Sequence, residues 1–451
     1  MLFYFVSPHN NINFFSWSQQ MKALRIEGPS KISGTIIPGG NKNAALPIIA
    51  ACLLTEEEVL IHNMPEIVDV RIMLEIAEYC GATVERNGKD VKICARNIVR
   101  SDLPASLCGK VRTSILFAGA LTYRCGSAKI GRSGGDVIGR RRLDSHYYGL
   151  RKLGIETVIS NSGSEFKMAR KNLTASDMFL DEASVTGTEQ IMIAAAVSKG
   201  TTIIRNAASE PHIQQLGELL QLMGAKVEGL DTNTLYITGS NHLHGAEYTI
   251  DSDHIEVASF MSLAAATRGG VEFEGKIRTH HYWMMRRIFT DRFGIHFKLH
   301  PNHIVMPAGQ RMKVHGDIGN AIPVISDGPW PQFPSDMMSC LLVAATQAKG
   351  TTLFFEKMFE SRIYFVDRLI AMGANAIICD PHRAVIAGPS KLHAIEMASP
   401  DIRAGMALVL AACCAKGTSI VNNADMIYRG YENLVEKLRL LGVNVTELDR
   451  K

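Results

Sequence analysis

The pattern of hydrophobic and polar positions repeats six times along the chain. In each copy, a helix-like stretch ends in an apolar residue and a glycine, and a short strand of alternating polarity follows. Glycine just past a helix is the usual left-handed cap, so each of these glycines predicts a helix end. They are 69 to 79 residues apart and lie at Gly81, Gly154, Gly224, Gly294, Gly373 and Gly442. This spacing predicts six copies of one compact α/β unit.

A second signal precedes each of these glycines. An alanine-rich stretch that is apolar on nearly every side runs through a polar turn into a β-branched strand, as at 191–206 and 406–423. A helix that is apolar all round is buried among other elements. Each unit is therefore expected to be βαβαββ-like. Six units predict an α/β protein with two domains of three units each, which face a cleft. The midpoint of the repeat lies near residues 251–256.

Composition and charge narrow the class of protein. The 451 residues are 46% hydrophobic and 20% charged, which is typical of a globular chain and excludes a disordered or fibrous one. No apolar run approaches the length of a membrane span, so we expect no contact with a membrane. A net charge of +4 is too small to predict nucleic-acid binding, but it allows a local basic pocket for a small anion.

Cysteine and histidine usage indicates a cytoplasmic protein without metal. The nine cysteines are scattered and form no CxxC pair, which favours reduced thiols over a disulfide frame or a zinc site. The histidines show no metal-ligand spacing, and no dinucleotide or P-loop motif is present, so we expect no metal and no cofactor. Residues 1–20 are uncharged and lack the basic start of a secretory signal. We expect them to be a disordered N-terminal extension, with the folded part beginning at Met21.

Polar segments that interrupt the repeat are candidates for chemistry. Lys42 and Asn43 follow a Gly-Gly turn and open an apolar helix, where backbone N–H groups and an ammonium would bind an anion. An ordinary helix cap with a solvated lysine would give the same pattern. Arg112 lies in the first turn before another apolar helix, where a cation opposes the helix dipole and favours a compensating anion.

The segment 131–146 combines glycines with a cluster of charges, which are Arg132, Asp136, Arg140, Arg141, Arg142 and Asp144. Glycines allow movement and arginine forks bind phosphate or carboxylate, so the segment is typical of a lid over an anionic ligand. A basic hairpin in solvent is the alternative interpretation. Nucleic-acid binding fits poorly, because the basic residues are confined to this one stretch.

Later segments add a candidate base and three candidate anion ligands. Asp336 follows a proline-rich stretch and opens an apolar helix. A carboxylate held by rigid backbone suits a general base, although an acid in the first turn also simply stabilises a helix. Arg362, Arg403 and Arg429 each lie at or just ahead of an expected helix start. Together with Lys42 they predict a cleft for a small ligand that carries two anionic groups.

These segments resemble the UDP-N-acetylglucosamine 1-carboxyvinyltransferases, a family of enolpyruvyl transferases. The motifs that carry the resemblance are GGNKNAALP, RxSI at Arg112, GGxxIGxR, FPSDM, FExR, DxRA and RGYExLxxKL, in that order. The resemblance covers nearly the whole chain from Met21. It implies an inside-out pair of α/β barrels in which the first strands join the second domain. The implied domains are 43–250, with a catalytic loop at 131–146, and 21–42 plus 251–451.

The resemblance also implies the reaction and its residues. The enolpyruvyl group of phosphoenolpyruvate would pass to the 3'-hydroxyl of UDP-N-acetylglucosamine with release of phosphate, which opens peptidoglycan synthesis. Asp336 would take the proton of that hydroxyl, Asp136 would protonate the methylene carbon, and Lys42 and Arg429 would assist catalysis. The implied substrate contacts are Lys42, Asn43, Arg112, Arg141, Arg142, Leu143, Asp144, Ser145, Asp336, Met358, Arg362, Arg403 and Arg429.

Three positions depart from the family pattern. Asp136 stands where the family usually has cysteine, so we expect insensitivity to epoxide phosphonates such as fosfomycin, which alkylate that thiol. Arg142 replaces a small loop residue, and Glu182 lies where a basic residue is frequent, so the nucleotide contacts are expected to differ there. The alternative functions are transfer to shikimate 3-phosphate and a sugar-nucleotide-binding homologue without catalysis. The GGNKNAALP and RGYE motifs favour the sugar-nucleotide branch.

Overall fold

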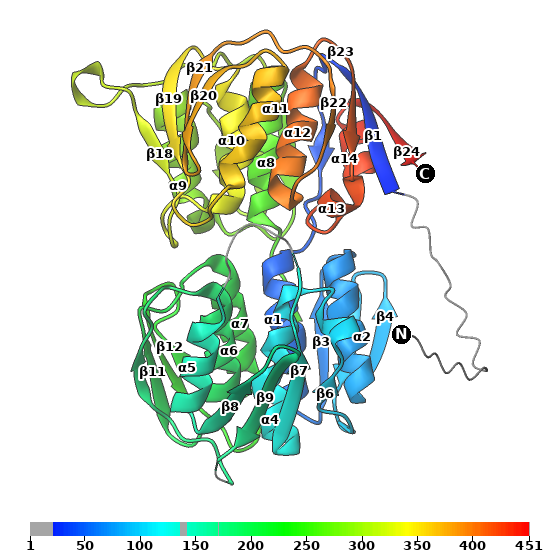
Figure 1. The fold of residues 1–451 in the computed structure, drawn as a ribbon, viewed down its shortest axis with the longest axis vertical. Helices are drawn as coiled ribbons and strands as arrows, with labels where there is room; N and C mark the ends of the chain where they lie inside the picture. The colour runs from blue at the N-terminus through cyan, green and yellow to red at the C-terminus, as the bar shows by residue number, and fades with distance from the viewer. Residues whose placement is uncertain (1–20, 136–141, 170, 451) are drawn as a thin grey trace, which may run out of the picture.

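The structure, a computed structural model, describes residues 21–135, 142–169 and 171–450. They form two lobes, drawn one above the other in Figure 1, and each lobe has its own hydrophobic core. The core of the first lobe is built from residues between Ala44 and Ile250. The core of the second lobe combines residues 24–36 with residues 255–445. The start of the described chain therefore packs with its end.

The elements of the first lobe begin with the helix that follows the Gly-Gly turn. Its helices are α1 Lys42–Ala51, α2 Val68–Cys80, α3 Ala105–Cys108, α4 Phe117–Cys125, α5 Asp144–Lys152, α6 Val185–Ala195 and α7 Pro211–Leu222. Its strands are β3 Glu58–His62, β4 Thr83–Asn87, β5 Asp90–Cys94, β6 Asp102–Leu103, β7 Ser127–Gly131, β8 Ile155–Ile159, β9 Gly163–Met168, β10 Asp177–Phe179, β11 Thr201–Arg205, β12 Lys226–Glu228, β13 Thr234–Thr238 and β14 Ala246–Thr249.

The second lobe has the same kinds of element. Its helices are α8 His254–Thr267, α9 Trp283–Met285, α10 Ser335–Ala345, α11 Val366–Ala371, α12 Ile402–Cys414, α13 Ala424–Tyr428 and α14 Leu434–Leu440. Its strands are β1 Met21–Gly28, β2 Thr35–Ile36, β15 Val271–Glu274, β16 Lys298–His300, β17 His303–Met306, β18 Val324–Ser326, β19 Gly350–Phe355, β20 Asn375–Asp380, β21 Arg383–Gly388, β22 Glu396–Ala398, β23 Gly417–Asn422 and β24 Asn444–Arg450.

The expected six-fold repeat is confirmed. The described strands form six sheets of four strands, as in β10-β11-β13-β12 and β18-β19-β21-β20, with the first pair parallel and the other pairs antiparallel. All six cap glycines have positive φ, from 65° at Gly294 to 113° at Gly81, as the left-handed cap requires. The chain is thus the α/β fold of six βαβαββ-like units that the hydrophobic pattern predicts.

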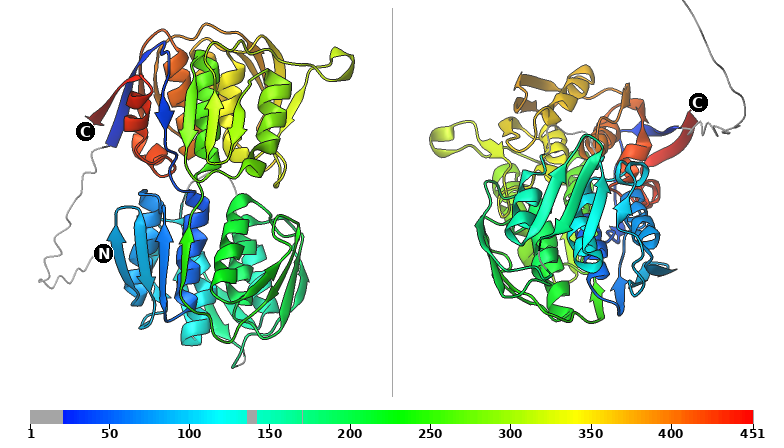
Figure 2. Two further views of the ribbon diagram at one scale, coloured as in Figure 1. Left: turned by 180° about the vertical axis from the view of Figure 1, so that it is seen from behind. Right: turned by 60° about the horizontal axis from the view of Figure 1, so that its bottom comes forward.

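The helices that are apolar on every side lie inside each lobe, and the sheets lie outside. In the second lobe, α8, α10 and α12 pack against one another, and α8 is buried from His254 to Ala266. In the first lobe, α1, α4 and α6 take the corresponding places (Figure 2). In an ordinary α/β barrel the strands lie inside and the helices outside, so this arrangement is inverted. Burial on all sides explains why these helices have no polar face.

The chain crosses between the lobes twice, and the two crossings lie side by side. β2 precedes α1 but pairs in parallel with β15 of the second lobe, while β14 ends the first lobe by pairing with β3. Between them, Asn41 N donates to Asp251 O at 2.8 Å and Asp253 N donates to Gly39 O at 2.8 Å. A Cβ on Gly40 would lie 1.9 Å from Asn63 O, so only glycine allows this approach. Figure 2 (left) shows both crossings.

Candidate active site

A cavity of about 470 Å³ lies between the two lobes. The first lobe contributes the starts of α1, α2 and α6, and the second contributes the starts of α10 and α12 and the end of α13. The sequence-predicted residues on its wall are Lys42, Asn43, Arg112, Arg142, Asp336, Met358, Arg362, Arg403 and Arg429. Segments hundreds of residues apart in the sequence therefore meet in one place.

Lys42 opens α1, whose cap is the neighbouring Asn41. The Asn41 side chain accepts a hydrogen bond from Ala44 N at 3.1 Å, as a helix cap does. The Lys42 ammonium forms an ion pair with Asp69 Oδ2 at 2.7 Å. Asp69 lies in the first turn of α2, and its other oxygen accepts from Arg429 Nε at 2.8 Å. One carboxylate thus joins cations from both lobes.

Asp69 is a residue that sequence reasoning missed. Burial alone would raise its pKa, but the charges of Lys42 and Arg429 outweigh burial and lower it, so Asp69 is ionised. An acid in a first helical turn looks like ordinary helix stabilisation, so the sequence carries no signal for this role. Arg429 also differs from expectation. It lies at the end of the short helix α13 rather than at a helix start, and its Nη2 donates to Lys110 O at 3.0 Å.

Asp336 lies in the first turn of α10 between two arginines. Its Oδ1 accepts from Arg362 Nη2 at 3.1 Å, and its Oδ2 accepts from Arg403 Nε at 3.0 Å. Burial opposes ionisation, but the two guanidinium groups outweigh it and hold the pKa of Asp336 well below its usual range. In this arrangement Asp336 is a carboxylate of low basicity. Arg403 Nη1 and Arg362 Nε are buried donors with no hydrogen-bond partner among the described residues.

A buried network fixes the position of Arg362. Arg362 Nη1 donates to Ser335 Oγ, which in turn donates to Glu356 at 2.7 Å. Burial and the neighbouring Asp327 raise the pKa of Glu356. Asp327 accepts from Met358 N at 3.3 Å, so the same network also places Met358 on the cavity wall. Rigid support of this kind holds a reacting group at a fixed distance from its ligand.

Buried carboxyl groups on the first-lobe side are a further feature that the sequence did not reveal. Burial, with the charge of Glu210 added, raises the pKa of Glu189 far above its usual value, and burial also raises the pKa of Glu210. Glu189 therefore favours the neutral form. The wall carries Lys42 and five arginines against five acidic side chains, so the cavity is positively charged overall even before the raised pKa of Glu189 is considered.

The described part of the glycine-rich segment lies at the rim of this cavity. Arg112 Nη2 donates to Arg142 O at 3.1 Å, and Arg142 Nε pairs with Asp144 Oδ2 at 2.5 Å. Ser145 Oγ donates to Glu182, which is on the wall, at 3.4 Å. Arg132, Leu143, Asp144 and Ser145 are themselves not on the wall. Asp136, Arg140 and Arg141 lie outside the described residues.

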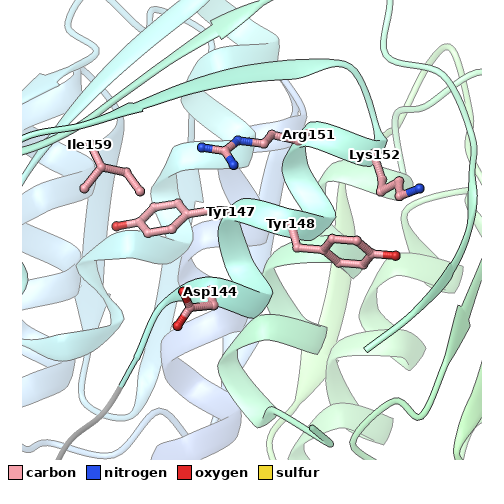
Figure 3. A pocket seen from close by; sticks show the side chains of 6 residues that line it. All are labelled: Asp144, Tyr147, Tyr148, Arg151, Lys152 and Ile159. Carbon is pink, nitrogen blue, oxygen red and sulfur yellow. The ribbon is translucent and has the colours of Figure 1, made fainter. Parts of the chain in front are cut away.

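A second cavity lies beside α5. Figure 3 shows its lining residues, which are Asp144, Tyr147, Tyr148, Arg151, Lys152 and Ile159. It shares no lining residue with the cavity between the lobes. Asp144, expected at the substrate, lines this second cavity instead. Asp144 forms an ion pair with Arg142, which lines the cavity between the lobes, so this pair links the two cavities.

The described residues contain no cluster of three or more His, Cys, Asp or Glu side chains that could hold a metal ion. No helix in the described ranges has the length and apolar character needed to cross a membrane. All nine cysteines are free thiols. The cavity between the lobes offers lysine and arginine groups for two anionic parts of a ligand, with a carboxylate at Asp336 beside them. This arrangement suits acid–base chemistry on an anionic substrate.

Comparison with known proteins agrees with this fold. The family model described as EPSP synthase (3-phosphoshikimate 1-carboxyvinyltransferase) matches residues 26–438. UDP-N-acetylglucosamine 1-carboxyvinyltransferase of Treponema denticola is 49% identical over 429 residues, covering 94% of this chain and 99% of that protein. The protein of the same name from Bradyrhizobium diazoefficiens is 48% identical, covering 94% and 98%.

Solved structures show the same architecture. The enolpyruvyl transferase NikO from Streptomyces tendae superposes with a TM-score of 0.84 at 22% identity, covering 96% of this chain and all of that one. EPSP synthase from Acinetobacter baumannii gives a TM-score of 0.74 at 17% identity, covering 95% of this chain. These two likenesses concern the fold alone. With the sequence relatives, they lead to one conclusion: the chain is a carboxyvinyltransferase and belongs to the family of UDP-N-acetylglucosamine 1-carboxyvinyltransferases.

Proposed function

We propose that this chain transfers the enolpyruvyl group of phosphoenolpyruvate to the 3'-hydroxyl of UDP-N-acetylglucosamine and releases phosphate. We place the reaction in the cytoplasm, as the opening step of peptidoglycan synthesis. The observation that carries the proposal is the cavity in which Asp336 lies between Arg362 and Arg403, while Lys42 and Arg429 come from different lobes and meet at Asp69. The names of relatives that match nearly their whole length support the choice of acceptor.

Phosphoenolpyruvate carries a carboxylate and a phosphate, and the cavity offers two groups of cations. We assign Lys42 and Arg429 to one anionic group, with Arg141 of the glycine-rich segment, and Arg403 and Arg362 to the other. The buried donors Arg403 Nη1 and Arg362 Nε would gain partners from such a ligand. Asp69 now holds Lys42 and Arg429 in place, and a bound anion would share these cations with it. Asn43 and Met358 would contact the acceptor sugar.

The reaction requires one proton donor and one proton acceptor. Asp136 protonates the methylene carbon of phosphoenolpyruvate, which makes the neighbouring carbon electrophilic, and Asp336 takes the proton of the attacking 3'-hydroxyl. The resulting tetrahedral adduct has a methyl group. Loss of a methyl proton and of phosphate restores the double bond in the product. The cations stabilise the charge on the carboxylate and on the leaving phosphate.

Asp336 can act as a base only if its basicity rises when substrate binds. Its contacts with Arg362 and Arg403 keep the pKa low in this structure. An anion bound to the same arginines draws part of their charge away and adds a negative charge nearby. Both effects raise the pKa of Asp336. Substrate binding would therefore switch Asp336 from an ion-pair partner to a base.

We also propose that residues 43–250 and residues 21–42 with 251–451 act as two domains that enclose the substrates. Lys42 lies at the boundary of the two ranges and opens α1 of the first lobe, on the same side as Asp69, whereas Asp336, Arg403 and Arg429 belong to the second lobe. The ligand would therefore be held by both. The paired crossings at Gly39–Asn41 and 251–253 would form the hinge. Closure would exclude water from the adduct.

Phosphate release with two acceptors tests the proposed function. The purified chain is incubated with phosphoenolpyruvate and either UDP-N-acetylglucosamine or shikimate 3-phosphate. We expect release with the sugar nucleotide only, and a loss of roughly 100-fold or more in kcat for Asp336→Asn. The exposed Asp367 begins a neighbouring helix, so Asp367→Asn is the matched control. Release with shikimate 3-phosphate would support the alternative acceptor, and binding of UDP-N-acetylglucosamine without release would support a non-catalytic homologue.

A further inference from the structure

Trp330 joins the segment before α10 to the first lobe. It belongs to the proline-rich stretch between β18 and α10, and only 9% of the residue is exposed. Its indole Nε1 donates to Asp231 Oδ1 at 3.3 Å. Its carbonyl oxygen accepts from Ser209 Oγ at 3.1 Å, and its backbone N–H donates to Glu210 Oε1 at 3.5 Å. All three partners lie in the first lobe, so one residue makes three hydrogen bonds between the lobes.

The indole ring of Trp330 also packs against two histidines near the crossings. The ring centroids of His254 and His281 both lie 6.1 Å from that of Trp330, at interplanar angles of 77° and 87°. Asn41, on one of the crossings, contacts His254 Nδ1 at 3.1 Å. His281 Nε2 lies 3.2 Å from Gln214 Oε1 of the first lobe. The aromatic cluster is therefore part of the contact between the lobes.

The same segment carries the proposed base. Asp336 follows Trp330 by six residues, and the intervening stretch is held by hydrogen bonds from Gly328 N to Phe333 O at 3.1 Å and from Gln332 N to Pro329 O at 3.0 Å. Trp330 and Asp336 both line the cavity. A fixed indole therefore limits where the start of α10 can lie relative to Lys42 across the cavity.

We propose that Trp330 is a positioning residue, which fixes the Asp336-bearing segment of the second lobe against the first lobe. This inference rests on the proposed function, because it gives Trp330 a part in the same reaction. Trp330 itself moves no proton. Its effect is to hold Asp336 and Arg403 at the distance from Lys42 that the reaction needs. A misplacement of about 1 Å in such an arrangement costs about 100-fold in rate.

Three variants separate the contributions of the ring and of the indole N–H. Trp330→Phe keeps most of the ring and removes the hydrogen bond, Asp231→Ala removes the same bond from the other side, and Trp330→Ala removes both. We expect kcat to fall roughly fivefold for each of the first two. For Trp330→Ala we expect a fall of roughly 100-fold. KM for both substrates should change much less than kcat. Trp283→Phe, at a tryptophan that is 70% exposed, is the control.

The double variant Trp330→Phe with Asp231→Ala tests whether the bond between the lobes is the cause. Both changes delete this hydrogen bond, and Asp231→Ala also removes the acceptor of Gln214 Nε2 at 3.0 Å. The double variant should therefore be no slower than Asp231→Ala alone. If the losses in kcat of the two single variants multiply in the double variant, the two side chains do not act through one bond, which would contradict the proposal. A wild-type kcat in Trp330→Ala would contradict it too. A matched fall in kcat and in the amount of folded protein, measured by thermal unfolding, would reduce Trp330 to a structural role and also overturn the proposal. If Trp330→Ala does not fold, the kcat values of Trp330→Phe and Asp231→Ala still test the proposal.

The pH dependence of kcat gives a readout that a structural role would not move. Burial lowers the pKa of His254 to about 4 and that of His281 to about 2, so both rings are neutral beside Trp330. Without the indole, water reaches them and their pKa values rise toward about 6.5. The charged and titratable groups that face these two rings are Arg403, Asp336, His212, Arg278 and His280.

A protonated His254 would add positive charge near Asp336 and lower the basicity of that carboxylate further, so Trp330→Ala should show a fall in kcat below about pH 6.5 that Trp330→Phe and the wild type lack. Identical profiles would contradict this part of the proposal. The two proposals fail in different ways. An inactive wild type would overturn the proposed function, whereas an active wild type whose Trp330 variants are equally active would overturn only the role of Trp330.

Discussion

At the scale of single residues, the cavity pairs each important cation with a carboxylate before any substrate binds. Asp69 holds Lys42 and Arg429, and Asp336 holds Arg362 and Arg403. These pairs keep positive groups ordered in a buried place where unpaired charges would be costly. Because of these ion pairs, an anionic substrate must share the four cations with Asp69 and Asp336 or displace these carboxylates from them. Preorganised cations of this kind stabilise developing charge without reorganising.

Asp136 gives the sharpest test at this scale. Asp136→Ala should reduce turnover by roughly 100-fold or more, because it removes the acid proposed to protonate the methylene carbon. The measurement is phosphate release under saturating substrates. Retained turnover would refute the role of Asp136 as the acid.

The exchange of Asp136 for cysteine has a separate expected outcome. Asp136→Cys should keep measurable turnover and become subject to time-dependent inactivation by an epoxide phosphonate, with a covalent adduct at residue 136 by mass spectrometry. The unchanged protein should resist the same compound, because a carboxylate is a weaker nucleophile than a thiolate toward the epoxide. Inactivation of the unchanged protein with an adduct at Asp136, or an insensitive cysteine variant, would show that another feature decides sensitivity.

At the scale of elements, helix starts place most of the chemistry. Asn41 caps α1 and thereby fixes Lys42, while Asp401 caps α12 by accepting from Arg403 N at 2.8 Å. Capped starts leave backbone N–H groups near the cavity and hold the first-turn side chains in one direction. The same two helices are buried on all sides, so the positions of Lys42 and Arg403 depend on the packing of the cores.

The Asn41 cap can be tested through stability. Asn41→Ala should lower the free energy of unfolding by about 1 kcal/mol, because Ala44 N loses its side-chain acceptor and keeps only the longer bond to Asn41 O at 3.2 Å. Chemical denaturation with guanidinium measures the change. Ser184→Ala removes the cap of α6, where Ser184 Oγ accepts from Gly187 N at 3.3 Å, and serves as the matched comparison. A neutral Asn41→Ala beside a destabilising Ser184→Ala would show that the Asn41 contact contributes nothing.

The hydrophobic pattern predicted where helices end and strands begin, but it did not predict which strands pair with one another. The glycine caps at positions such as Gly81 and Gly373 are local signals, and every one ends a helix as expected. The pairing of β14 with β3 and of β2 with β15 depends on the chain crossing twice, and no local pattern of residues records it. Arginines of the fourth to sixth units were predicted to be anion ligands because they recur at expected helix starts. Asp69 and Glu189 look like ordinary helical acids, so only the fold reveals them.

At the scale of the whole molecule, the interface between the lobes contains many buried titratable groups. His281 and His254 lie there with lowered pKa values, whereas Glu189 on the first-lobe wall has a raised one. All three are thus held neutral by burial. Groups of these two kinds have opposite effects on stability as the pH changes.

Two neutral replacements should show these opposite effects. The unfolded chain binds a proton at His281 below about pH 6.5 and the folded chain does not, so the wild type loses stability as the pH falls. His281→Gln should therefore gain relative stability by about 1.4 kcal/mol per pH unit below about 6.5. Glu189 loses its proton in the unfolded chain above about pH 4.5 but keeps it when folded, so Glu189→Gln should gain relative stability as the pH rises.

Denaturation midpoints of the wild type and both variants between pH 4 and 8 measure these differences. Slopes of opposite sign are expected for the two variants. Parallel curves, or slopes of the same sign, would mean that burial does not hold these groups neutral in the folded protein.

The account as a whole depends on one reaction, and the product made in heavy water tests it most directly. Protonation of the methylene carbon and later loss of a methyl proton exchange hydrogen with solvent. Phosphoenolpyruvate and UDP-N-acetylglucosamine are incubated with the chain in deuterium oxide, and the acceptor is analysed by mass spectrometry and proton NMR. We predict one phosphate released per enolpyruvyl ether formed on the 3'-oxygen, with deuterium in its vinyl group. No ether on the sugar nucleotide, or an ether whose vinyl group carries no deuterium, would contradict the account.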